Sequence, residues 1–273
     1  MLPFVGAGLV LDTHWWATAE SSVAVWTLGL SALLGLITWK LRAATPAAAC
    51  AGAAITAQLM FSTAQYPYEP WHTALIPVLA VSLLAFASTR VGVGTKERLG
   101  SAEDRSGRSA AQVAANLGVA AMAAGDIVMS WMTNGHWHSR ATAIPFLAVS
   151  LAALAEAAAD TVSSEIGQVL GGPPRMVTTL RRVEPGIDGA VSVAGTIAGI
   201  LAGAAVAALG SWAFRGSLTL FAVSCAGAVF GLFFDSLLGA TLERRGWLNN
   251  DMVNFLSTAS AAGFALASLA ILR

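Results

Sequence analysis

Charged residues are scarce in this sequence. Asp, Glu, Lys and Arg make up only 11% of the 273 residues, whereas a soluble domain carries about 25%. So few charges cannot cover a surface exposed to water, and 56% of the residues are hydrophobic. The composition therefore argues against an ordinary soluble domain and predicts an integral membrane protein.

Cysteine and net charge are lacking as well. The two cysteines, Cys50 and Cys225, lie inside apolar runs, which indicates small packing residues rather than a disulfide or a metal pair. The formal net charge is zero, so nothing favours nucleic-acid binding by electrostatic attraction. The first 20 residues contain no Lys or Arg, so no signal peptide is expected. We predict that segment 1–20 is weakly ordered.

Long apolar runs take the place of the missing charges. They extend over roughly 20 residues, the length that a helix needs to cross a bilayer, and they are rich in small residues that allow close helix packing. We predict an all-α polytopic membrane protein with about eight transmembrane helices, in one domain of residues 1–273. The weakest span contains Gln58, and a tilted or re-entrant segment is the alternative there. The expected spans are 22–39, 47–64, 71–89, 110–132, 141–159, 188–210, 216–239 and 252–272.

The distribution of positive charge predicts the orientation. With both termini outside, the inside loops contain twelve Lys and Arg residues and the outside loops contain three, Arg140, Arg215 and Arg273. Cytoplasmic loops carry such an excess. We therefore predict cytoplasmic loops at 90–109, 160–187 and 240–251. A prokaryotic inner membrane is the expected location, with the active site facing the cytoplasm.

Acidic residues gather at the predicted inner ends of the spans: Glu156, Asp160, Asp235 and Asp251. Ionisable groups at membrane depth are costly and usually line a site or a cavity. Glu156 and Asp160 are four residues apart and share a helix face. Asp160 and Glu165 fall on different faces of a continuous helix, so both serve one site only if the helix breaks or two partners flank it. Hard oxygen ligands of this kind suit Mg²⁺ bound to a nucleoside triphosphate.

Each of these features also has a simpler interpretation. Loop arginines are needed for topology alone, and carboxylates at span ends serve as helix caps. Asp126 is expected to make a structural hydrogen bond. His136 and His138 have metal-like spacing but lie in an outside loop without further ligands. The simple interpretation does not explain why the polar residues gather on one side, so the residues alone indicate a membrane enzyme or transporter with an anionic cytoplasmic substrate.

Four ordered segments resemble the phytyl-phosphate and prenyl-phosphate kinase family, which includes the plastid enzyme of the vitamin E pathway and its animal and prokaryotic transmembrane relatives. The resemblance extends over about residues 22–260 and includes residues 45–53 and 110–116. The departures are Ser109, Val162, Ser163, Asp188 and Glu243, none of which removes a main acidic residue. The four segments are residues 159–167, 173–196, 234–245 and 249–258.

The resemblance implies that the terminal phosphate of CTP is transferred, with Mg²⁺ as cofactor, to a prenyl monophosphate in a membrane lipid environment; a homo-oligomer is left open. It implies the following site residues. The catalytic and Mg²⁺-binding residues are Asp160, Glu165, Asp235 and Asp251. The residues for substrate and phosphate are Arg108, Gln112, Ser164, Arg175, Thr178, Thr179, Arg182, Asn250 and Asn254.

Two other functions remain as alternatives. One is another CTP-dependent lipid enzyme, either a polyprenol kinase or a cytidylyltransferase that makes a CDP-lipid. The other is a transporter or flippase for an anionic isoprenoid or a small solute. A transporter predicts charges near the midplane and paired broken helices in two halves, whereas the polar residues here gather on one side.

Overall fold

The predicted all-α fold is confirmed by the computed structural model, which describes residues 1–100, 106–125 and 140–272. Asp126, His136 and His138 lie outside the described residues. The only strands in the described residues form a two-stranded antiparallel ribbon, β1 (Arg175–Met176) and β2 (Ala190–Val191). The helices are α1 (Leu2–Ala19), α2 (Ser21–Lys40), α3 (Pro46–Thr63), η1 (Pro70–His72), α4 (Leu75–Arg90), α5 (Val93–Leu99), α6 (Ala110–Ala124), α8 (Arg140–Leu170), α9 (Val193–Ala213), α10 (Leu218–Leu238), the π-helix η2 (Gly239–Glu243) and α11 (Asn250–Ile271).

Fewer helices than predicted have the length and composition of a full membrane span. In the described part of the chain, α2, α8, α9, α10 and α11 are long and apolar enough to cross a membrane. Helices α4 and α5 make a sixth candidate if they are one span, bent by 71° at the break between them. Helix α3 does not qualify, and α6 is a shorter apolar helix. The eight spans and the outside position of both termini therefore stay predictions.

The N-terminal segment is an ordered helix, which differs from the weak order predicted for it. Helix α1 packs against α2 and α3, and Asp12 on its inner face is buried. The Gln58 amide donates a 2.7 Å hydrogen bond to the Asp12 carboxylate. Burial of both groups is tolerated because each supplies the other with a hydrogen-bond partner. Gln58, which weakened the predicted span at 47–64, thus makes a polar contact between α3 and α1.

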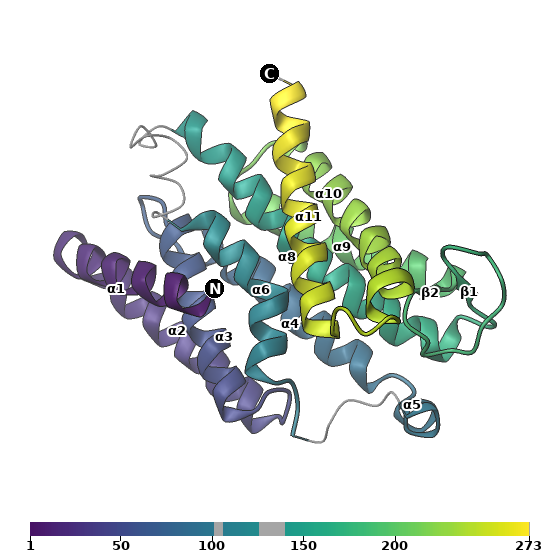
Figure 1. The fold of residues 1–273 in the computed structure, drawn as a ribbon. Coiled ribbons are helices and arrows are strands. Elements are labelled where there is room, and N and C mark those ends of the chain that lie inside the picture. Colours follow the sequence, from purple (N-terminus) through teal and green to yellow (C-terminus); the bar gives the residue numbers. More distant parts are fainter. Residues whose placement is uncertain (101–105, 126–139, 273) are drawn as a thin grey trace.

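Helix α8 lies at the centre of the bundle (Figure 1). It packs against α4, α6, α9, α10 and α11, and 83% of its apolar window is buried, compared with 28–39% in the other four spanning helices. Its core stretch from 151 to 159 contains six alanines, all at most 1% exposed. Small side chains let the neighbouring backbones approach closely. The other helices therefore pack around α8, and this packing positions the site.

Two helices continue into regions predicted as loops. Helix α8 extends to Leu170, well past the predicted span end at 159, and η2 continues α10 through Glu243. The segment after residue 159 contains neither proline nor a Gly pair until Gly171, so nothing interrupts the helix earlier. Gly172 then adopts a φ of +62°, and two prolines follow, a common way to end a helix. Residues 160–170 of the predicted loop are therefore helical.

Candidate active site

A polar cavity of about 470 Å³ lies where the ends of α6, α8, α10 and α11 meet the segment that leads through β2. Carboxylates, amides, hydroxyls and backbone groups line it, in contrast to the apolar packing of the bundle. It is built from segments far apart in the sequence that converge on the C-terminal half of α8. Eight predicted site residues line it: Arg108, Gln112, Asp160, Ser164, Glu165, Asp235, Asn250 and Asn254.

The deepest part of the site is a cluster of carboxylates. Asp160 from α8 and Asp235 from α10 are close enough for their side chains to interact. Glu156, one helical turn before Asp160, is only 1% exposed and interacts with both of these carboxylates. Ser257 of α11 contacts Glu156 and Asp235. Three acidic groups from two helices therefore converge at one place.

Two oxygens of this cluster are buried without a hydrogen-bond partner among the described residues, Glu156 Oε1 and Asp235 Oδ1. A buried carboxylate oxygen without a donor is energetically costly, and such groups gather where a cation or a substrate binds. No group of three or more His, Cys, Asp or Glu residues in the described ranges is arranged to hold a metal by itself. Mg²⁺ needs only one or two carboxylates, with water and phosphate oxygens as its other ligands, so Asp160 and Asp235 fit it.

Gly231 allows α10 to approach this cluster. A Cβ atom at this position would lie 2.5 Å from Glu156 Cγ, 2.9 Å from Ala261 Cβ and 3.0 Å from the Ser257 carbonyl oxygen. The absence of a side chain therefore brings α8, α10 and α11 into contact around the carboxylates.

We expect Gly231→Ala to destabilise the protein by about 1–3 kcal/mol, the usual cost of overpacking a core. The measurement is the thermal unfolding midpoint in detergent. Gly263→Ala on α11 is the matched control, because a Cβ there meets nothing within 4 Å and alanine favours the helix. Equal midpoints for the two variants would contradict the close packing at Gly231.

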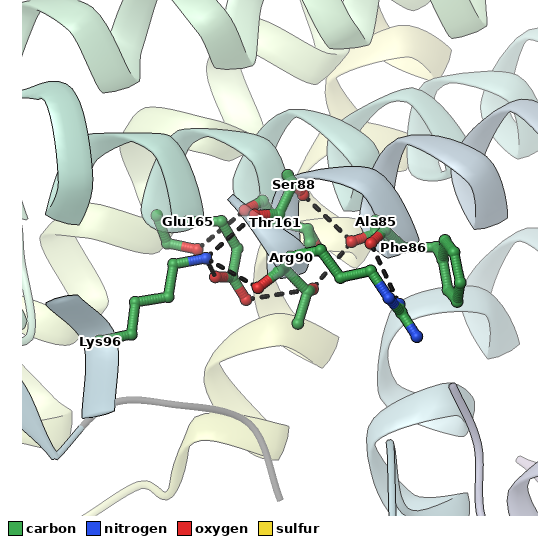
Figure 2. A network of polar contacts seen from close by, with 9 residues as sticks. Ala85, Phe86, Ser88, Arg90, Lys96, Thr161 and Glu165 are labelled. Atoms are coloured by element: carbon green, nitrogen blue, oxygen red, sulfur yellow. Dashed lines mark hydrogen bonds and ion pairs between the residues drawn. The ribbon is translucent and has the colours of Figure 1, made fainter. Parts of the chain in front are cut away.

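Glu165 lines the polar cavity and interacts with Asp160, and it also forms an ion pair with Lys96 of α5. Figure 2 shows Lys96 reaching Glu165 and the end of α4 together. The Lys96 ammonium donates to the carbonyl oxygens of Ser88, at 2.9 Å, and Thr89, at 3.0 Å. These carbonyls belong to the last turn of α4, where positive charge is favourable. The Ser88 carbonyl also accepts from the Val91 N–H at 3.1 Å. Lys96 therefore connects α4, α5 and α8.

The bend between α4 and α5 brings Lys96 to this position. Gly92 adopts a φ of +63°, and a Cβ atom there would lie 2.5 Å from Val169 Cγ1 on α8. Only glycine combines this backbone conformation with such a close approach. Sequence reasoning treated Lys96 as a topological charge, and no spacing rule connects it with Glu165, which lies 69 positions later.

Two of the predicted binding residues also have structural contacts. Gln112 Oε1 accepts a 2.7 Å hydrogen bond from the Ser109 backbone N–H, and the Ser109 hydroxyl accepts one from the Gln112 N–H at 3.2 Å. This reciprocal pair is a capping box at the start of α6. The Ser164 hydroxyl donates to the Thr161 carbonyl at 3.1 Å. Gln112 and Ser164 are thus held in defined positions beside the cavity.

Five predicted site residues do not line the cavity: Asp251, Arg175, Thr178, Thr179 and Arg182. Arg175 and Arg182 pair through their backbones, and the Arg175 guanidinium donates to the Leu180 carbonyl at 2.8 Å. This hairpin and its ribbon lie at the edge of the bundle (Figure 1). Pro174, which precedes the hairpin, and residues 185–192, which follow it, line the cavity.

The cavity also contains polar residues outside the predicted set. Asn116, Gln168, Asp188 and Glu243 line it. Asp188 and Glu243 are two of the departures from the prenyl-phosphate kinase resemblance. Asn116 is a polar residue near the start of the apolar run at 110–132. These features are visible in the sequence but do not by themselves place the residues in one site.

The apolar helix bundle and its polar cavity define an integral membrane protein with a polar site. Residues 29–262 match the family described as Integral membrane protein DUF92, and the chain belongs to that family. The family relationship predicted from the four segments is confirmed. No solved structure matches the chain.

Three relatives illustrate the relationship. An uncharacterized membrane protein of Synechocystis sp. is 34% identical over 72% of this chain and 73% of its own length. The protein VTE6, chloroplastic, of Arabidopsis thaliana is 31% identical over 66% of this chain and 54% of its own length. An uncharacterized membrane protein of Methanocaldococcus jannaschii is 41% identical over 40% of this chain. The chain spans 45% of that archaeal relative.

Proposed function

We propose that the chain is a kinase that transfers the terminal phosphate of CTP to a prenyl monophosphate at the cytoplasmic face of a membrane. The observation that carries the proposal is the pairing of Asp160 and Asp235 in a polar cavity that also contains Arg108. The resemblance of four segments to prenyl-phosphate kinases and the similarity to a chloroplast protein support the same reaction.

The residues suit a transfer between two phosphates. The acceptor is a phosphate monoester, whose oxygen is nucleophilic at neutral pH, so no strong general base is needed. That oxygen attacks the terminal phosphorus of CTP, the bond to the bridging oxygen breaks, and CDP leaves with the electron pair. The protein contributes positioning and charge neutralisation.

We assign these tasks to residues that line the cavity. Asp160 and Asp235 would hold Mg²⁺, which supplies charge neutralisation at the phosphates when it is bound. Arg108 interacts with Asp160 and orients the acceptor phosphate. Asn250 and Asn254 at the start of α11 orient the nucleotide. Glu165 is already neutralised by Lys96, so its proposed role changes from metal ligand to positioning residue.

The test is an assay of purified protein in detergent with Mg²⁺, CTP and geranylgeranyl monophosphate. We expect geranylgeranyl diphosphate and CDP in equal amounts. Pyrophosphate and a CMP-linked lipid would instead identify a cytidylyltransferase. A folded protein that turns over none of a series of prenyl monophosphates, with CTP or any other nucleoside triphosphate, would overturn the proposal and favour transport.

A further inference from the structure

A second cavity, of about 420 Å³, lies beside the polar one. It is lined by α2, α3, α4 and α6, together with Ala157 of α8. Aliphatic side chains and alanines make up most of it, including Leu34, Val78, Val81 and Val113. Because the described helices line it mostly with apolar groups, it suits a hydrocarbon chain.

One end of this apolar cavity is cationic. Arg42, Arg90, Lys96 and Arg108 all line it, and they lie at the ends of helices or in the connections between them. Lys96 is neutralised by Glu165, and the Arg90 guanidinium stacks on Phe86 with 3.3 Å to the ring centroid. An apolar cavity with several positive charges at one end has the charge distribution of a site for an anionic amphiphile.

The two cavities share Arg108 and Asn116. The backbone fixes Arg108 at this junction: its N–H donates to the Ala43 carbonyl at 3.1 Å, and its carbonyl accepts from the Thr45 N–H at 3.0 Å. Its side chain interacts with Asp160 in the polar cavity. An anionic head group at Arg108 would therefore lie between the apolar cavity and the paired carboxylates.

We infer that the cavity between α2, α3, α4 and α6 binds the isoprenoid chain of the acceptor, with the acceptor's phosphate at Arg108. The inference rests on the proposed function, because it names the place of that reaction's lipid substrate. The side chains that line the cavity then determine which lengths of isoprenoid chain fit. Gly52 is the position where this is tested most directly, because it lines the cavity and a Cβ atom there meets only Val113 Cγ1, at 3.7 Å.

The test measures binding of radiolabelled geranylgeranyl monophosphate to the full chain in detergent, without nucleotide. We expect Gly52→Leu to weaken binding about tenfold, because its side chain occupies the space of the isoprenoid chain. Val81→Phe narrows the same cavity from α4 and should act alike, which covers the case that one variant fails to fold. Binding of the five-carbon dimethylallyl monophosphate should change much less.

Gly29→Leu is the matched control, since Gly29 lies on an exposed face of α2 and a Cβ there meets nothing within 4 Å. If Gly52→Leu and Val81→Phe bind geranylgeranyl monophosphate with the same affinity as Gly29→Leu, the inference is overturned, even if the protein is a kinase. Equal losses of affinity for geranylgeranyl monophosphate and dimethylallyl monophosphate would also overturn it. Chain-length-dependent binding without any phosphate transfer would support the chain site and overturn the proposed kinase reaction instead.

Discussion

Replacement of Asp235 by Asn is expected to abolish phosphate transfer while the fold is retained. The change removes a proposed Mg²⁺ ligand but keeps the shape of the side chain. It also removes one charge from a cluster that contains Glu156 and Asp160, and the new amide donates to Asp160. We expect kcat to fall at least about 1,000-fold, equivalent to about 4 kcal/mol, and the unfolding midpoint to stay level or rise.

Glu97→Gln is the control for this experiment. Glu97 is exposed on α5 and lines neither cavity, so loss of its charge should leave kcat within about twofold. Asp160→Asn should behave as Asp235→Asn does. Retained turnover in both carboxylate variants would remove the metal assignment, whereas a lowered midpoint would show that the carboxylates stabilise the fold.

Replacement of Lys96 by Met is expected to cause the largest loss of stability. The side chain of Lys96 is 1% exposed, and that of its partner Glu165 is 17% exposed. Removal of the ammonium leaves the Glu165 carboxylate without its cation, removes the ammonium donor of the Thr89 carbonyl, and removes one of two donors to the Ser88 carbonyl, which still accepts from the Val91 N–H. Breaking one side of a buried ion pair costs about 3–5 kcal/mol. The thermal midpoint in detergent should therefore drop markedly.

Two further variants separate the ion pair from general effects on α5. Arg98→Met removes a cation from the same helix. The Arg98 guanidinium is exposed and donates to the Thr95 hydroxyl, so little change in the thermal midpoint is expected. The double variant Lys96→Met with Glu165→Leu should recover part of the loss, because no unpaired charge remains. If Lys96→Met is no less stable than Arg98→Met, the contact does not hold α5 against α8.

The helical fold and its family could be predicted because composition and motifs depend on local sequence. The scarcity of charge and the length of the apolar runs predicted a helical membrane protein. The ends of helices were harder to predict, because a hydropathy window does not register a polar helix such as residues 160–170. The packing of α1 was not predicted either, because its contacts join positions far apart in the sequence, such as Asp12 and Gln58, 46 positions apart.

The candidate site was predictable only in part, for the same reason. The four-residue spacing of Glu156 and Asp160 correctly placed them on one face. Glu165, five residues after Asp160, lines the same cavity as Asp160, although the spacing predicted a different face. The sequence left open whether a helix break or a second partner resolves this conflict. In the structure α8 is continuous, Asp160 interacts with Asp235 of α10, and Glu165 pairs with Lys96 of α5. Arg175 and Arg182 were predicted to bind phosphate because they belong to a segment that resembles the family. They do not line the cavity, because a sequence motif does not specify how its loop packs against the helices.

The central position of α8 has a consequence for how the chain tolerates changes in length. An extra residue between Leu151 and Asp160 would rotate every later side chain of the helix by about 100° and advance it by about 1.5 Å. Asp160 would lose Asp235, and Glu165 would lose Lys96, although no functional residue had been replaced. We therefore expect α8 to tolerate no insertion or deletion in this stretch, because its length sets the relative positions of Glu156, Asp160 and Glu165.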